Sequence, residues 1–271
     1  MRVRATSPCH HSRVDAICDD LTAEHGALDA IVASLTESEW KRPTPAVGWS
    51  IQDEVGHLTY FDGTATLALI DPDAFTASVE SLLSGLGTDD PTLAESRAMS
   101  GADLLERWRS GRAALLTELR RTDPKARIPW YGPPMSARSF ATARLMETWA
   151  HGQDIVDALG VEREPTDRLR HIAHIGVRAR PFSYVTNGRE VPEGEVRVEL
   201  RGPSGDTWTW NESSTDVVRG DALDFCLVVT QRRHVADTAL EVEGPLAADW
   251  IAIAQAFAGP PGSGREPGQF A

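Results

Sequence analysis

The stretch LMETWAHGQDIVDALG, residues 145–160, predicts a helix that packs against neighbours on more than one side. Leu145, Trp149 and Val156 recur at helical spacing and form an apolar stripe. Glu147 and His151 fall nearly opposite that stripe. Further apolar residues surround these two, namely Phe140, Ala143, Ala150, Ile155 and Ala158. The two polar side chains are therefore expected to point into a protected space between elements.

The remainder of the first half is also typical of helices. Four helices are predicted, over residues 12–35, 49–70, 101–121 and 136–159. Ser50 and Asp53 have the spacing of a capping box at the start of the second helix, and Pro72 lies just beyond its end. Residues 74–100 are polar and are predicted to be a loop. Four long helices favour a four-helix bundle, in which facing side chains can build an internal metal site.

The hydrophobic period changes to two in the second half. The segment VRVELRGPSGDTWTW, residues 196–210, predicts a β-hairpin that turns at Gly202-Pro203-Ser204-Gly205. A helix capped by Asp221, a strand within residues 238–244 and a final helix from Pro245 to about residue 258 follow. Strands mixed with helices predict an α+β domain.

The two patterns divide the chain into predicted domains of residues 1–165 and 166–271. The helical segment 168–185 lies between linker-like stretches and could belong to either half. The C-terminal sequence GPPGSGREPGQFA predicts a mobile tail.

Composition excludes several classes of protein. The chain has 271 residues and a net charge of −13, so a phosphate backbone would be repelled and nucleic-acid binding is not expected. The apolar runs are too short for a membrane span, and the N-terminus lacks the features of a secretory signal, which predicts a cytoplasmic protein. Three cysteines without a C-x-x-C pair argue against a disulfide framework, and Cys226 is expected to be a buried small hydrophobe.

Glu147 and His151 are candidate metal ligands because they stand four residues apart on one helix. The pair is weak evidence alone, since about one such pair is expected by chance and most are ordinary helix neighbours. His57, on the second predicted helix, is the best source of a third ligand. Two imidazoles and a carboxylate can hold Zn²⁺ with a fourth position open, as in catalytic sites, and Ni²⁺ or Fe²⁺ accept the same ligands.

Other charged side chains are candidates for contacts with a ligand. Arg232 and Arg233 are adjacent and could hold a substrate carboxylate through paired N–H donors, although surface solvation explains them as well. Asp154, one turn beyond His151 on the same helix, is a candidate to contact a metal ligand or a cofactor. His25 is predicted to be a surface residue.

The segments GWSIQDEVGHLTYFD and METWAHGQDIVDALG together resemble the DinB-like metal-binding superfamily, in the branch of mycothiol-dependent maleylpyruvate isomerases from actinobacteria. The resemblance covers roughly residues 12–160 and implies His57, Glu147 and His151 as the metal ligands. The second half resembles the C-terminal region of an uncharacterised actinobacterial metal-binding family, where related isomerases carry a sterol-carrier-protein-like domain. The implied fold is a DinB-like four-helix bundle followed by a smaller α+β domain.

The resemblance also implies a chemistry. A cation with an open coordination position favours the thiolate form of a low-molecular-weight thiol such as mycothiol. The expected function is isomerisation or S-transfer on a small electrophilic substrate, by a monomer or a homodimer. Two alternatives stay open: a metal-dependent hydrolase with the same ligands, and a non-catalytic carrier of small molecules or lipids.

Overall fold

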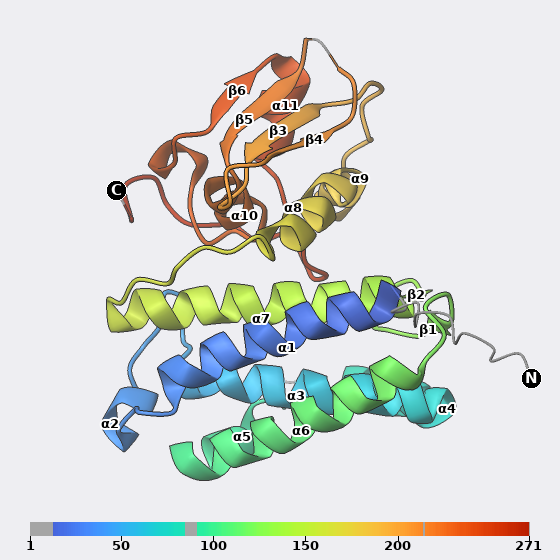
Figure 1. The fold of residues 1–271 in the computed structure, drawn as a ribbon, viewed down its shortest axis with the longest axis vertical. Helices are drawn as coiled ribbons and strands as arrows, with labels where there is room; N and C mark the ends of the chain where they lie inside the picture. Colours follow the sequence, from blue (N-terminus) through green and yellow to red (C-terminus); the bar gives the residue numbers. More distant parts are fainter. Residues whose placement is uncertain (1–12, 85–90, 214, 271) are drawn as a thin grey trace, which may run out of the picture.

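The computed structural model describes residues 13–84, 91–213 and 215–270. Four long helices lie along one another in the lower half of Figure 1: α1 (Arg13–Val32), α3 (Ile51–Ile70), α6 (Gly101–Arg121) and α7 (Ala137–Leu159). A small sheet with short helices forms the upper half, above α7. The predicted fold class, a helical bundle followed by a smaller α+β region, is confirmed.

Local sequence signals set the ends of the bundle helices. Ser50 and Asp53 form the predicted capping box of α3, in which each side chain bonds the backbone N–H of the other residue. Ser136 caps α7, and Gly160 ends it with a φ of 67°, a conformation that glycine adopts without strain. These caps explain why the bounds of the two ligand-bearing helices could be predicted closely.

The expected loop between α3 and α6 is partly helical. Helices α4 (Pro72–Ser84) and α5 (Ala94–Arg97) lie there, and the short α2 (Glu37–Trp40) precedes α3. The prediction treated Pro72 as a stop, but proline is well tolerated in the first turn of a helix. Asp71 accepts a bond from the Ala74 N–H at 3.0 Å, and Phe75 is buried and stacks on Trp130. Capping and burial therefore favour a new helix.

The sheet has the strand order β4-β3-β5-β6. Its strands are β3 (Arg197–Arg201), β4 (Thr207–Trp210), β5 (Val217–Asp221) and β6 (Glu241–Glu243). β3 and β4 form the predicted hairpin, with Val198 opposite Trp210 and Leu200 opposite Trp208. β5 was not predicted. It pairs in parallel with β3, and its short apolar segment, Val217 and Val218, gives too little alternation to be identified.

The other elements of the α+β region are short. They are α8 (Leu169–Arg178), α9 (Arg180–Thr186), α10 (Ala222–Val229), the 3₁₀ turn Val235–Asp237 and α11 (Pro245–Ile251), while β1 (Arg127–Ile128) and β2 (Met135–Ser136) form a small ribbon before α7. The prediction that the last helix reaches residue 258 was wrong. The N–H of Gln255 bonds the Ser183 hydroxyl at 3.0 Å, and the N–H of Ala256 bonds the Val229 carbonyl at 2.8 Å, so the chain turns away from α11.

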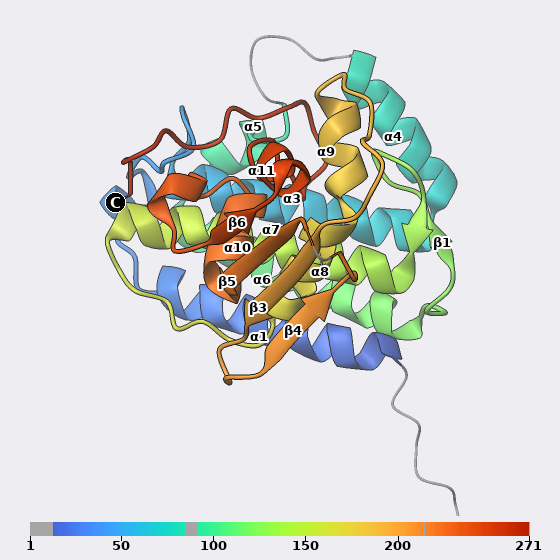
Figure 2. The same cartoon turned by 90° about the horizontal axis from the view of Figure 1, so that it is seen from above.

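One core joins the bundle to the α+β region. Met146 and Trp149 of α7 belong to the same buried apolar cluster as Ile172 of α8 and Val228 of α10. Figure 2, viewed from above, shows the sheet and α10 lying over α7. The predicted domain boundary between residues 165 and 166 therefore stays a prediction, because residues from both sides of it belong to the same buried apolar cluster. Among the described residues, no helix is both long and apolar enough to cross a membrane.

His25 of α1 lies inside the bundle, so its predicted surface position was wrong. Its side chain is 2% exposed, packs edge-on against Trp108, and lies 4.0 Å from a carboxylate oxygen of Asp62. Burial lowers the pKa of His25 to about 4. Asp62 also accepts a bond from Arg144 Nε at 3.0 Å. A polar cluster therefore occupies the centre of this bundle.

Candidate metal centre

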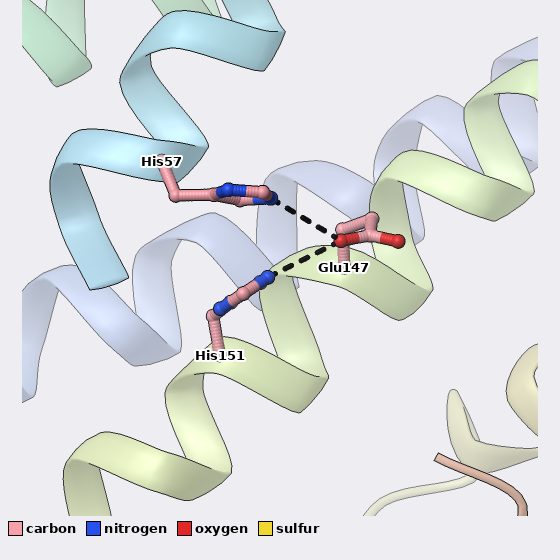
Figure 3. Close-up of side chains that lie close together, drawn as sticks. All are labelled: His57, Glu147 and His151. Atoms are coloured by element: carbon pink, nitrogen blue, oxygen red, sulfur yellow. Dashed lines mark hydrogen bonds and ion pairs between the residues drawn. The ribbon is translucent and has the colours of Figure 1, made fainter. Parts of the chain in front are cut away.

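His57, Glu147 and His151 meet on one side of the bundle (Figure 3). α3 carries His57, and α7 carries Glu147 and His151 one turn apart. Glu147 Oε2 lies 3.8 Å from His57 Nε2 and 3.3 Å from His151 Nε2. One ligand atom from each residue falls within 4.8 Å of the others. The helices thus bring the three predicted ligands together.

Aromatic rings hold the two imidazoles. Trp49 stacks on His151 with ring planes 13° apart and also packs against His57. Phe61, one turn after His57 on α3, lies 4.4 Å from the His57 ring centroid. The side chains of His57, Glu147 and His151 are 19%, 22% and 11% exposed, so each keeps limited access to the adjacent cavity.

Glu54 is a site residue that the sequence analysis missed. Its fully buried carboxylate lies 2.6 Å from His151 Nδ1, and its other oxygen accepts a bond from the Thr44 hydroxyl at 2.7 Å. A carboxylate accepts hydrogen bonds, so Nδ1 donates and Nε2 faces Glu147. One signal was available: Glu54 stands three residues before His57 and so shares its side of α3.

The protonation of the cluster depends on burial and on these contacts. Burial, together with the neighbouring His151, lowers the pKa of His57 to about 4. Burial alone would also lower the pKa of His151, but hydrogen bonds to Glu147 and Glu54 outweigh it and raise this pKa to about 9. Burial opposes ionisation of Glu147, yet hydrogen bonds from His151 and His57 hold its pKa well below the usual value. His57 and Glu147 therefore stand ready as ligands at neutral pH, whereas a cation at His151 must displace a proton.

Asp154 lies one turn beyond His151 and is buried. Its Oδ2 accepts bonds from Arg232 Nε at 3.1 Å and Nη2 at 2.8 Å, and its Oδ1 accepts one from Arg265 Nη2 at 2.6 Å. Asp154 therefore ties two segments of the C-terminal region to the ligand-bearing helix. Its contact with a cofactor stays a prediction.

The two adjacent arginines have different surroundings. Arg232 lines the cavity and uses three N–H groups on Asp154 and the Thr230 carbonyl, which leaves two N–H groups for a ligand. Arg233 forms a two-point ion pair with Asp157, at 2.7 Å for each bond, and lies over the Phe270 ring. Arg233 is thus held away from the cavity lining, and the structure does not bring it to the cluster.

A cavity of about 1890 Å³ adjoins the three candidate ligands. Its wall runs along α7 from Arg138 to Asp154, a distance of about 24 Å at 1.5 Å per residue. Aromatic side chains that line the cavity near His57 include Phe61, Trp130 and Tyr131.

Arg265 anchors the C-terminal tail at the edge of the cavity, although most residues of the tail are exposed. Arg265 is 13% exposed and donates to the Pro45 carbonyl at 2.9 Å as well as to Asp154. Gly262 donates its N–H to the Gln255 side chain at 3.2 Å. The sequence predicted mobility from glycine and proline content, and it gave no sign of the buried acceptor that binds Arg265.

The donor set fits a divalent cation. Two imidazole nitrogens and one carboxylate oxygen converge, and the carboxylate–imidazole contact of Glu54 and His151 is of the kind that orients metal-bound histidines. A second group, made of Glu54, His151 and Asp154, is also compact. Its oxygens already accept bonds from Thr44, Arg232 and Arg265, which favours the first group as the metal centre.

Comparison with known proteins agrees with the predicted resemblance. Residues 21–156 match the family model described as the mycothiol maleylpyruvate isomerase N-terminal domain. Two uncharacterized proteins of Mycobacterium tuberculosis, from strains CDC 1551 / Oshkosh and ATCC 25618 / H37Rv, are each 48% identical over 248 residues, which is 91% of this chain and 96% of the relative.

The fold is similar to two solved structures. These are the crystal structures of the mycothiol-dependent maleylpyruvate isomerase and of its histidine-to-alanine mutant, each with a TM-score of 0.55 and 15% identity, covering 83% of this chain and 91% of the other. At this identity the likeness concerns the fold. On the strength of the family match and the long alignments to its relatives, the chain belongs to the DinB-like, mycothiol maleylpyruvate isomerase N-terminal domain family.

Proposed function

We propose that this protein is a metal-dependent enzyme that uses a low-molecular-weight thiol of the mycothiol type to isomerise a small electrophile or to transfer sulfur to it. The observation that carries the proposal is the convergence of His57, Glu147 and His151 at a large cavity, with Glu54 behind His151. Family membership supports the choice of thiol.

In this proposal the three ligands hold a divalent metal, with Zn²⁺ as the first choice. A metal held there would favour the thiolate form of the thiol and so supply a nucleophile near neutral pH. Glu54 keeps the His151 ring in one orientation with Nε2 toward the centre. Trp49 and Phe61 pack against the His57 ring at a tilt and restrict its movement.

The cavity supports a reaction between two bound molecules. Pockets for one small ligand usually measure about 300–1000 Å³, whereas this cavity is about 1890 Å³. Arg232 is the proposed group for a substrate carboxylate. Two of its N–H groups have no hydrogen-bond partner among the described residues, while Asp154 fixes its guanidinium. The cavity therefore has room for a thiol and an acidic substrate beside the same metal.

The test begins with metal analysis of the purified full-length chain, followed by calorimetric titration with mycothiol. Stoichiometric metal that is lost in His57→Gln and His151→Gln is expected, together with saturable thiol binding. His171→Gln is the matched control, because His171 lines the same cavity but pairs with Asp20. Each variant is first checked for folding by circular dichroism.

The outcomes separate the candidate functions. Metal content that stays unchanged in both ligand variants would overturn the metal centre. Bound metal without affinity for a thiol would favour a hydrolase with the same ligands. A chain that binds lipids or small molecules and holds no metal would favour a carrier.

A further inference from the structure

Six arginines line the cavity, and they fall into two groups. Arg144, Arg232 and Arg265 pair with the buried carboxylates of Asp62 and Asp154. The other three, Arg138, Arg170 and Arg178, have no ion pair with a carboxylate in the part of the chain that the structure describes. The chain has 40 acidic and 27 basic residues, so most arginines are expected to find an acidic partner. Three cavity-lining arginines without such a partner are therefore unexpected from composition alone; they are called the unneutralised arginines below.

The three unneutralised arginines come from two neighbouring helices, α7 and α8. Arg170 and Arg178 stand eight residues apart on α8 with His174 midway, so the three share one face of that helix. Arg138 lies in the first turn of α7, which packs against α8. Each of these four side chains lines the cavity.

His174 adds a donor to this group. Trp210 Nε1 can only donate, and it lies 3.2 Å from His174 Nδ1, so Nδ1 accepts and the ring proton of the neutral imidazole is on Nε2. Burial and the surrounding Arg178 and Arg138 lower the pKa of His174, as expected where positive charge is concentrated. Arginine has donors and no acceptor, so this wall suits a ligand rich in acceptors.

The acids on the same wall are already engaged. Asp20 bonds His171 Nε2 at 2.8 Å, and Asp167 accepts the backbone N–H of Ser204 at 3.1 Å. Neither forms an ion pair with Arg170, although both line the cavity. Arg170 lies over the Trp208 ring, 5.9 Å from its centroid. The three unneutralised arginines and His174 are all exposed, and their donors have no acidic partner among the described residues.

We propose that Arg138, Arg170, Arg178 and His174 bind a phosphate or carboxylate group of the substrate, far from the reacting centre. Arg138 precedes Glu147 by nine residues on α7, which is about 14 Å along the helix. The substrate class is therefore an elongated small molecule with this second anionic group at one end, and with the electrophilic carbon and the carboxylate assigned to Arg232 near the metal. This assignment rests on the proposed function for the reaction, whereas anion binding itself does not require the metal.

The test is a titration of the full-length chain at low salt with inorganic phosphate and, separately, with succinate. The NMR signals of the Trp210 indole N–H and the His174 ring report binding at this wall, and the two probes distinguish phosphate from carboxylate. Saturable shifts are expected with at least one probe. Arg170→Gln combined with Arg178→Gln should weaken that binding by about ten-fold or more, because charge-assisted bonds are lost.

Controls separate this subsite from net charge and from the metal. The control is the double variant Arg121→Gln with Arg201→Gln, which removes the same charge. These exposed arginines pair with Glu118 and Asp221. Because salt screens distant charges, the control should change the affinity for the anion by less than about two-fold. His57→Gln should keep anion binding at this wall while it loses metal. The double variant at Arg170 and Arg178 should keep metal and thiol binding, so failure of one proposal is distinguishable from failure of the other.

Several results would overturn the anion subsite. These are an absence of saturable shifts with both probes, an equal loss of affinity in the charge-matched control, or loss of the shifts in His57→Gln. Tighter binding of a single-stranded RNA oligonucleotide than of either small anion, reported by the same signals, would assign the wall to a polyanion instead.

Discussion

His151 and Glu54 form a buried hydrogen bond of 2.6 Å between Nδ1 and Oε2, across the interface of α7 and α3. The bond orients the imidazole so that Nε2 faces Glu147, 3.3 Å away. The Thr44 hydroxyl donates to the other oxygen of Glu54, so two side chains in series support the candidate ligand. Support of this kind fixes the tautomer and raises the basicity of a ligating histidine.

Glu54→Gln should weaken metal binding by about 10–100-fold, because an amide cannot hold the His151 ring as strongly as a carboxylate. Equilibrium competition with a chromophoric chelator measures the affinity. Glu24→Gln is the matched control: Glu24 is also buried on a bundle helix, but it pairs with Arg168 and Arg163. Its substitution should leave metal affinity unchanged, and an equal loss in both variants would contradict a specific role for Glu54.

His25 should destabilise the bundle in acid. Its folded pKa is about 4, below the value of about 6.5 in an unfolded chain. As the pH falls, His25 therefore binds a proton in the unfolded state before it does so in the folded state. The free energy of unfolding is unaffected by His25 above about pH 6.5, and it decreases as the pH falls toward 4, by up to about 1.4 kcal/mol per pH unit. Urea unfolding at several pH values checks this. His25→Gln should flatten the acid limb relative to the parent chain, and an unchanged slope would show that His25 titrates normally.

Arg265→Gln should release the C-terminal tail from the cavity edge. Arg265 connects this segment to Asp154 and to the Pro45 carbonyl, and glutamine lacks both the charge and the reach for these contacts. Hydrogen–deuterium exchange of residues 260–270 should become faster. Arg189→Gln breaks an exposed ion pair with Asp249 and serves as the control. Equal exchange in the parent chain and in Arg265→Gln would mean that other contacts hold the tail.

Gly176→Ala should destabilise the packing of α8 on α10. A Cβ atom at this position would lie 2.7 Å from Val229 Cγ2, and valine has little freedom to move aside. Overpacking of this kind costs about 1–3 kcal/mol. Gly111→Ala on α6 is the matched control, because nothing lies near its added Cβ and alanine favours a helix by up to about 1 kcal/mol. Thermal denaturation should shift in opposite directions, and a gain in both variants would contradict the close approach.

The sequence determined the elements that depend on local signals. The capping box of Ser50 and Asp53, the cap at Ser136 and the left-handed Gly160 set the ends of α3 and α7. Alternating residues and a glycine-proline turn specified the β3–β4 hairpin. Elements that depend on packing escaped prediction, since α4 is held by the burial of Phe75 and β5 by pairing with β3.

The candidate metal ligands could also be identified from the sequence, because helical spacing places Glu147 and His151 together and the family resemblance adds His57. Only the tertiary structure decided what surrounds them. Glu54 reaches His151 across two helices, and Arg265 reaches Asp154 over 111 residues of chain. Such contacts carry no periodic signal, because they depend on how separate elements pack. The ends and faces of helices follow from residues that are neighbours in the sequence. The partners of buried polar groups depend on the tertiary structure, because each such group needs a hydrogen bond in the folded interior.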